Sequence, residues 1–170
     1  IRDAEGTPVK QYAARVPFGA GFSNPELARV SAENLTLWDT EHPYLYTVDV
    51  ELRRGTHIED TVTLKTGFRT VLAAPDGFYL NGEKLKLVGL DRHQSYPYAG
   101  YALPERVQAA DADVLRNYLH VNTVRTSHYL QSEGFLSRCD EVGLLVFSEI
   151  PGWGYIGGEK FKETSHQDIR

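Results

Sequence analysis

Hydrophobic and polar residues alternate in the first part of the chain. Residues 44–52 place apolar side chains at every second position, which is the period of a half-buried β-strand. The turn-forming residues 53–56 then predict a hairpin into a partner strand at about 59–64. No helical spacing interrupts residues 1–70, and short, closely spaced strands favour a portion of an immunoglobulin-like sandwich. About four or five strands fit into this length.

The hydrophobic period changes after residue 75. Residues 78–80 and 85–88 flank Asn81-Gly82, which predicts a hairpin with a tight turn. Beyond it, apolar strand patterns alternate with patterns of helical period. The expected strands are 86–91, 122–126 and 144–148, and the expected helices are 104–119 and 132–142, with a third helix beginning near Ser165. Helices that alternate with buried strands imply βαβ units on a parallel sheet.

The two patterns together predict a multidomain β plus α/β fold. The β portion covers residues 1–70, and the α/β portion covers residues 71–170.

Each expected parallel strand ends in polar residues. The first ends in Asp91-Arg92-His93, the second in Arg125-Thr126-Ser127-His128 and the third in Glu149. In α/β barrels the active site forms at the carboxyl ends of the strands, so three such ends in succession indicate a shared site. The alternative is that these residues are solvated where the strands reach the surface.

An aromatic side chain, Trp153, lies in the loop after Glu149. Aromatic rings at the rim of a polar pocket suit sugars, whose C–H faces stack on the ring while their hydroxyls meet polar groups. Packing of Trp153 into the mouth of a barrel is the alternative.

Composition narrows the class of protein. The formal net charge of −5 argues against nucleic acid as a partner, and no 18-residue apolar run predicts a membrane span. We expect no signal peptide, since no basic segment followed by an apolar stretch opens the chain, although the compartment stays open between cytoplasmic and periplasmic or secreted. The single cysteine, Cys139, excludes an internal disulfide and follows apolar residues at helical spacing, which predicts a buried thiol.

The stretch 122–153, NTVRTSHYLQSEGFLSRCDEVGLLVFSEIPGW, resembles a signature of glycoside hydrolase family 2, the β-galactosidase and β-glucuronidase group. Supporting similarities are GLDRHQSYPYAG at 89–100, the GFR and FxLNG motifs at 67–69 and 78–82, and LW and PYLY at 37–38 and 43–46. One departure is Leu130, which stands where the family usually has proline.

The resemblance implies a fold and a place in a longer enzyme. The chain would hold the latter part of an immunoglobulin-like domain and the first three βα units of a TIM (β/α)8 barrel. The family's acid/base is the Glu of an Asn-Glu pair after the fourth barrel strand, and its nucleophile is a Glu on a later strand. No Asn-Glu dipeptide occurs in these 170 residues. We therefore expect a fragment that lacks both catalytic carboxylates and is inactive alone.

The resemblance also implies roles for individual residues. Arg125 would hold the nucleophile ionised, and His93 and His128 would bond sugar hydroxyls. Asp91 would make a further polar contact with substrate at the end of the first strand, and Trp153 would also bind substrate. Glu149 would lie near the acid/base, where an Mg²⁺ or Na⁺ ion could bind, although no cofactor is required.

The implied reaction of the parent enzyme is retaining hydrolysis of β-galactosides or β-glucuronides in carbohydrate metabolism. A carbohydrate substrate and a homo-oligomeric parent are expected, without nucleic acid or membrane partners. Galactoside, glucuronide and mannoside stay open as substrates.

Two other functions compete with this one. A metal-dependent hydrolase on the same barrel would use His93, His128 and Glu149 as ligands, but it leaves the nearby cation of Arg125 unexplained. A non-catalytic module that binds carbohydrate or acts as a scaffold is the second alternative.

Overall fold

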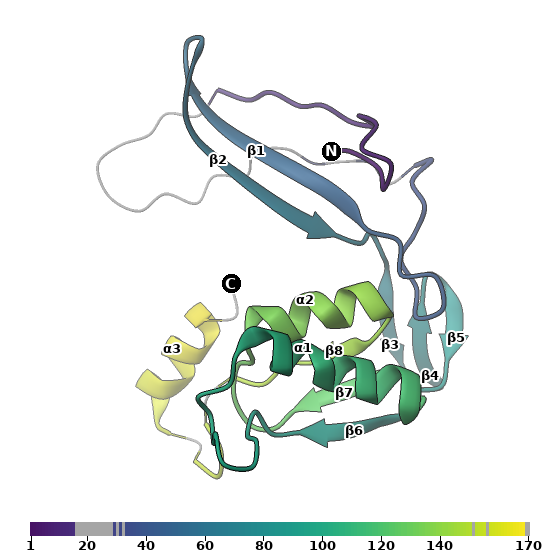
Figure 1. The fold of residues 1–170 in the computed structure, drawn as a ribbon, viewed down its shortest axis with the longest axis vertical. Coiled ribbons are helices and arrows are strands. Elements are labelled where there is room, and N and C mark those ends of the chain that lie inside the picture. Colours follow the sequence, from purple (N-terminus) through teal and green to yellow (C-terminus); the bar gives the residue numbers. More distant parts are fainter. Residues whose placement is uncertain (16–28, 30, 32, 151, 156, 169–170) are drawn as a thin grey trace. The chain divides into compact units, whose positions relative to one another are not determined.

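The computed structural model describes residues 1–15, 29, 31, 33–150, 152–155 and 157–168. The chain divides into two compact units, which are drawn in Figure 1. The first unit comprises Ile1–Leu37 and Tyr44–Phe68, and the second comprises Trp38–Pro43 and Arg69–Arg170.

The first unit is built on one antiparallel hairpin. Strands β1 (Tyr46–Arg54) and β2 (His57–Thr66) pair along their whole length, with an irregularity in register between Leu52 and Arg53. Gly55 takes φ 64° in the turn, a left-handed conformation in which a side chain would be strained. The predicted hairpin is confirmed, with β1 shifted by two residues from the expected 44–52 and β2 longer than the expected 59–64 at both ends. Within the described part of residues 1–70 these are the two strands present, and the rest of the expected sandwich falls partly on residues 16–28, 30 and 32, outside the described residues.

The N-terminal segment extends this hairpin. Arg2 and Thr47 exchange both backbone hydrogen bonds, at 2.8 and 3.0 Å. The Arg2 side chain bonds Asp49 on the same strand through Nε at 2.8 Å. The segment therefore adds one bridge to the open edge of β1.

The second unit opens with a three-stranded antiparallel meander. Its strands are β3 (Val71–Ala74), β4 (Gly77–Leu80) and β5 (Glu83–Leu85), in the order β3-β4-β5. Asn81 and Gly82 take φ 53° and 85°, as a type I′ hairpin turn requires. The Asn-Gly hairpin is confirmed, but its second strand lies at 83–85 rather than 85–88.

A parallel sheet follows, and it agrees with the predicted βαβ units. Strands β6 (Gly89–Arg92), β7 (Thr123–Thr126) and β8 (Leu145–Phe147) lie in the order β6-β7-β8, with both pairings parallel. A Cβ on Gly89 would lie 2.3 Å from Cγ2 of Thr123, so only glycine allows these strands to approach this closely.

Helices cover one face of this sheet (Figure 1). They are α1 (Glu105–Asp113), which continues as the π-helical segment η1 (Val114–Tyr118), and α2 (Glu133–Val142). Ser132 caps α2 by accepting a hydrogen bond from the Phe135 N–H, and Gly143 ends it with φ 81°. The core between helices and sheet consists of Ala112, Leu115, Val121, Val124, Phe135, Cys139 and Leu144.

Two helix predictions need correction. The helix expected over 104–119 is α-helical only to Asp113, because the last turn widens into η1. The third helix, α3 (Glu159–Asp168), begins six residues before the predicted start at Ser165. Phe161 is the only strongly apolar residue in its first turns, so no hydrophobic period marked its beginning.

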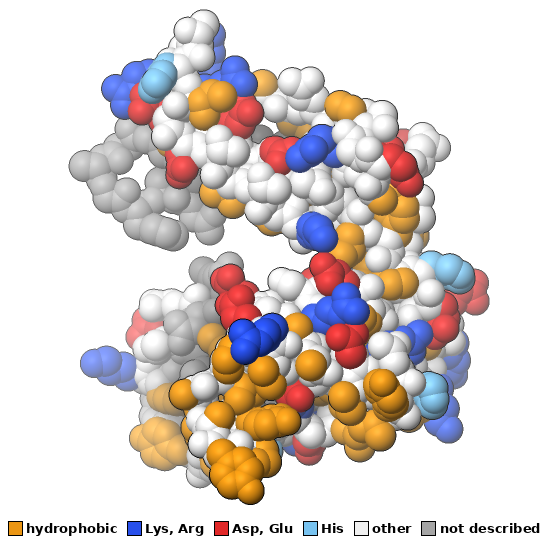
Figure 2. Space-filling model, in the orientation of Figure 1, with side chains coloured by type: hydrophobic (Ala, Val, Ile, Leu, Met, Phe, Trp, Pro, Cys, Tyr) orange, Lys and Arg blue, Asp and Glu red, His pale blue; other side chains and the backbone are white. Residues whose placement is uncertain are grey.

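The helices of the described residues are all short, and none is long and apolar enough to cross a membrane. Hydrophobic side chains gather on the second unit around α1 and the loop that precedes it (Figure 2).

Candidate functional site

The parallel register brings the first charged pair together. Asp91 at the end of β6 is the direct partner of Arg125 on β7, and both side chains point to the face away from the helices. Arg125 Nη1 lies 3.4 Å from Asp91 Oδ2. Phe147 on β8 completes this row across the sheet. The parallel register of β6 and β7 therefore sets the pairing of Asp91 with Arg125.

Glu149 links the ends of β7 and β8. One carboxylate oxygen forms an ion pair with Arg125 Nε, and the other lies 3.0 Å from His128 Nδ1. The Glu149 backbone N–H donates to Thr126 Oγ1 at 3.2 Å, which fixes the chain just after β8.

The same contacts set the charge of Glu149. Partial burial would raise the pKa of its carboxyl group, but the hydrogen bond from His128 and the ion pair with Arg125 outweigh burial and hold the pKa below its ordinary value. Glu149 is therefore ionised at neutral pH. An ionised carboxylate only accepts hydrogen bonds, so His128 donates its Nδ1–H to Glu149. In this tautomer Nε2 is the hydrogen-bond acceptor of the ring.

Aromatic rings cover this polar group. The His93 and His128 rings meet edge to face with centroids 5.4 Å apart. Trp153 stacks on His128, with centroids 5.0 Å apart and an interplanar angle of 25°, and it lies 6.0 Å from His93. Trp153 is still 70% exposed, so its ring rests on the histidines and keeps a large open surface.

The structure thus brings every residue of the predicted site into one connected cluster. These residues are Asp91, His93, Arg125, His128, Glu149 and Trp153. They come from the carboxyl ends of β6, β7 and β8 and the loops that follow, where α/β barrels carry their active sites. Their individual roles stay predictions.

Sequence reasoning missed the residues that hold the loops of the site together. The Gln94 N–H donates to the Tyr129 hydroxyl at 2.9 Å, and Gln94 Oε1 accepts from the Ser132 N–H at 2.8 Å. The loop after β6 is thereby joined to the loop after β7, which carries His128. No periodic pattern marks these contacts, because both partners lie in loops.

Arg92 is a second residue of this kind. Its side chain is only 6% exposed and points toward the helices, opposite to Asp91. Its guanidinium bonds Asp111 and Gln108 on α1 and Gln131 before α2, and it lies 4.0 Å above the Phe135 ring. The period of two along β6 could have found it, since Arg92 lies between two residues of the opposite face.

The predicted metal role of Glu149 does not fit these contacts. Both of its carboxylate oxygens bond cationic or N–H partners, and Arg125 places a permanent positive charge beside it. A metal would have to displace one of these partners. Among the residues that the structure describes, no three His, Cys, Asp or Glu side chains are grouped to hold a metal ion. The same geometry disfavours the alternative of a His93–His128–Glu149 metal centre.

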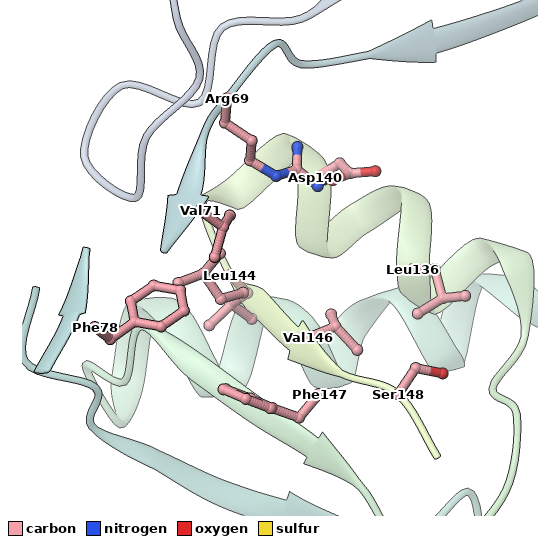
Figure 3. A pocket seen from close by; sticks show the side chains of 10 residues that line it. Arg69, Val71, Phe78, Leu136, Asp140, Leu144, Val146, Phe147 and Ser148 are labelled. Carbon is pink, nitrogen blue, oxygen red and sulfur yellow. Dashed lines mark ion pairs between the residues drawn. The ribbon is translucent and has the colours of Figure 1, made fainter. Parts of the chain in front are cut away.

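A separate cavity lies along the outer edge of β8 (Figure 3). It measures about 410 Å³ and is lined mainly by apolar side chains of α2, β8 and the meander, with the ion pair of Arg69 and Asp140 at 3.6 Å on its rim. Leu136, Val146 and Phe147 form part of its wall. No residue of the predicted site lines it, so the cavity and the polar cluster are distinct features of this unit.

Family models match both parts of the chain. The model described as glycosyl hydrolases family 2, TIM barrel domain, matches residues 73–169, and a model described as glycosyl hydrolases family 2 matches residues 1–69.

Individual relatives agree with these matches. A beta-galactosidase of Thermoanaerobacterium thermosulfurigenes is 55% identical over 138 residues, which are 81% of this chain and 19% of that protein. A beta-glucuronidase of Rattus norvegicus is 34% identical over 126 residues, 74% of this chain and 19% of that protein. The crystal structure of a Parabacteroides merdae beta-glucuronidase with glycerol in its active site superposes with a TM-score of 0.78 at 31% identity, covering 98% of this chain and 21% of that chain. The chain spans about a fifth of the length of the curated relatives it matches.

Proposed function

We propose that this chain, which belongs to glycosyl hydrolase family 2, is part of a retaining β-glycosidase that acts on carbohydrate. The single observation that carries the proposal is the cluster of Arg125, Glu149, His128 and Trp153 at the carboxyl ends of parallel strands, in the part that matches the family's barrel. Relatives named beta-galactosidase and beta-glucuronidase support a β-linked substrate.

The cluster suits the binding of a sugar. The exposed face of Trp153 can stack on the C–H face of a pyranose ring, while His93 and His128 reach its hydroxyls. Nε2 of His128 can accept a hydrogen bond from a sugar hydroxyl, because Glu149 holds Nδ1 as the donor. Such bonds strengthen when positive charge develops on the sugar in the transition state.

The catalytic carboxylates are proposed to lie outside these 170 residues. A retaining glycosidase needs one carboxyl group that is protonated and can act as an acid. Glu149 does not suit this role, because Arg125 and His128 engage both of its carboxylate oxygens and hold its pKa below the ordinary value. The proposed role of Glu149 is to position His128 and Arg125, and the proposed role of Arg125 is to hold a nucleophilic carboxylate ionised.

Activity measurements test the proposal in two settings. The 170-residue chain alone should hydrolyse no nitrophenyl β-glycoside above background. In the enzyme that carries this chain, His128→Ala should lower kcat by about 10²–10³, the loss typical of one transition-state hydrogen bond.

His166→Ala, at an exposed position on α3, serves as the control and should leave kcat unchanged. Hydrolysis by the isolated chain that Glu149→Gln abolishes would show that Glu149 is itself catalytic. Equal activity of His128→Ala and wild type would contradict the proposed role of the cluster.

A further inference from the structure

The loop between β6 and α1 carries three exposed tyrosines. Tyr96, Tyr98 and Tyr101 lie within six positions of one another, directly after the site residues of β6. Figure 2 shows hydrophobic side chains gathered over this loop. Exposed aromatic side chains that cluster next to a polar site indicate a binding surface, because isolated exposed apolar residues are ordinary but clusters are not.

Rings connect this loop to the site without a break. Tyr101 packs edge to face on Tyr129 with centroids 5.9 Å apart, and Tyr129 lies 6.2 Å from His93. His93 in turn lies 6.0 Å from Trp153. Each step is comparable to the size of one sugar ring. The series from Trp153 to Tyr101 is therefore long enough to contact sugar units beyond the one held over Trp153.

The backbone of the loop holds Tyr98 at its tip. Tyr96 and Gly100 exchange both backbone hydrogen bonds, at 3.1 and 2.9 Å, which closes residues 96–100 into a tight turn. Tyr98 is fully exposed and takes φ 68°, a conformation that favours glycine. The turn therefore presents the ring of Tyr98 with both faces open to a ligand.

The chemistry of the loop selects the class of ligand. Residues 95–103 contain no charged side chain, and their polar groups are hydroxyls. Tyrosine offers a large, rigid face together with a hydroxyl, at a low cost in conformational entropy. Such a surface suits neutral sugars. A uronic acid or a phosphorylated glycan would require a cation, and residues 95–103 supply none.

We propose that Tyr98 and Tyr101 form an extended subsite that binds further units of a neutral β-linked oligosaccharide, beyond the sugar stacked on Trp153. This inference rests on the proposed function, because it assigns a further part of the same substrate. The subsite favours longer glycans over simple monoglycosides.

The experiment compares substrates of different length in the enzyme that carries this chain. Specificity is expressed as kcat/KM for neutral β-linked tetrasaccharides of galacto, manno and gluco configuration, divided by kcat/KM for the matching methyl β-glycoside. Tyr98→Ala should lower this ratio about fivefold to tenfold, the loss expected for one exposed stacking contact. Tyr101→Ala should lower it by a similar factor. Tyr98 is fully exposed, so its thermal melt serves as a check that the substitution leaves the fold intact.

Tyr118→Ala is the matched control, because Tyr118 is a tyrosine on η1, before the amino-terminal end of β7, whose exposed fraction of 76% lies between those of Tyr101 and Tyr98. It should leave the ratio unchanged. A ratio in Tyr98→Ala equal to that of wild type, in an enzyme that hydrolyses methyl β-glycosides normally, would overturn the subsite alone. An enzyme that hydrolyses no β-glycoside of any length would overturn the proposed function and the subsite with it. A loss of thermal stability in Tyr98→Ala without a change in the ratio would assign the ring to packing and also overturn the subsite.

Discussion

Replacing Arg92 should destabilise the packing of α1 and α2 on the sheet that carries the site. The guanidinium lies between β6, α1 and the start of α2, and it donates to Asp111 at 3.0 and 2.6 Å and to Gln108 at 2.7 Å. It also bonds Gln131. In Arg92→Ala the buried amides of Gln108 and Gln131 would lose a partner, and the Asp111 carboxylate would lose its counter-charge.

The loss of stability in Arg92→Ala follows from how deeply the partners of Arg92 are buried. Removing Arg92 leaves the buried amide oxygens of Gln108 and Gln131 without a donor, and each unsatisfied buried polar group costs about 1–3 kcal/mol, whereas the Asp111 carboxylate is 33% exposed and partly solvated. The contact of the Arg92 guanidinium with the Phe135 ring would be lost as well. Hydrogen exchange of peptides from α1 and α2 should therefore be roughly 10² to 10³ times faster in the variant. Arg92→Lys should show an intermediate effect, since an ammonium group cannot reproduce the planar fork.

Arg138 provides a matched control on the same pair of helices. It bridges α2 to Asp113 on α1 at 2.7 Å, with the same Arg–Asp chemistry, but its side chain is 37% exposed. Solvent screening limits such pairs to about 0–1 kcal/mol, so Arg138→Ala should accelerate exchange by less than about sixfold. Equal exchange rates in Arg92→Ala and Arg138→Ala would refute the reasoning, because burial would then not decide the cost.

Three further predictions concern other parts of the chain. Because the folded-state pKa of Glu149 is lowered, its ionised form stabilises the fold above the ordinary Glu pKa of about 4.3, and this contribution is lost as the pH falls through the lower folded value. The melting temperature of Glu149→Gln should therefore fall less steeply than that of wild type over this acid range, and parallel curves would contradict the assignment. Burial raises the pKa of the Cys139 thiol to about 12, so Ellman's reagent should label it only after urea unfolding, and rapid labelling of the folded protein would contradict this. The 170-residue chain alone should associate with increasing concentration in light scattering, because β8 pairs with β7 alone among the described strands and exposes Phe147, whereas a monodisperse monomer would show that this edge is covered.

Local sequence was sufficient to predict the elements and their order. The alternation over 44–52, the Asn81-Gly82 turn and the helical spacing over 132–142 each act within a few residues, and each expected element formed. The parallel pairing also followed, because helices between short apolar strands leave little other choice. Strand β3 was missed, since Val71–Ala74 has no alternation of apolar and polar residues.

The sequence predicted which residues form the site, but it did not predict which of them contact one another. Polar residues at three strand ends identified Arg125, His128 and Glu149, and topology brought them together. Their pairing depends on register and on loop conformation, which no periodic pattern specifies. Glu149 is the clearest case, because its residue type did not indicate that Arg125 and His128 would be its two partners.

Arg125 has donors left for the nucleophilic carboxylate that is proposed to lie outside these 170 residues. Its Nε is used by Glu149 and one Nη1 hydrogen by Asp91, so donors on Nη1 and Nη2 stay available to a further acceptor. A nucleophilic carboxylate that bonds these donors would share one cation with two other anions. The cation would then lower the pKa of the nucleophile less than an unshared arginine would, because the neighbouring carboxylates oppose it. On the proposed role of Arg125, removing Asp91 should therefore strengthen the hold of Arg125 on that nucleophile.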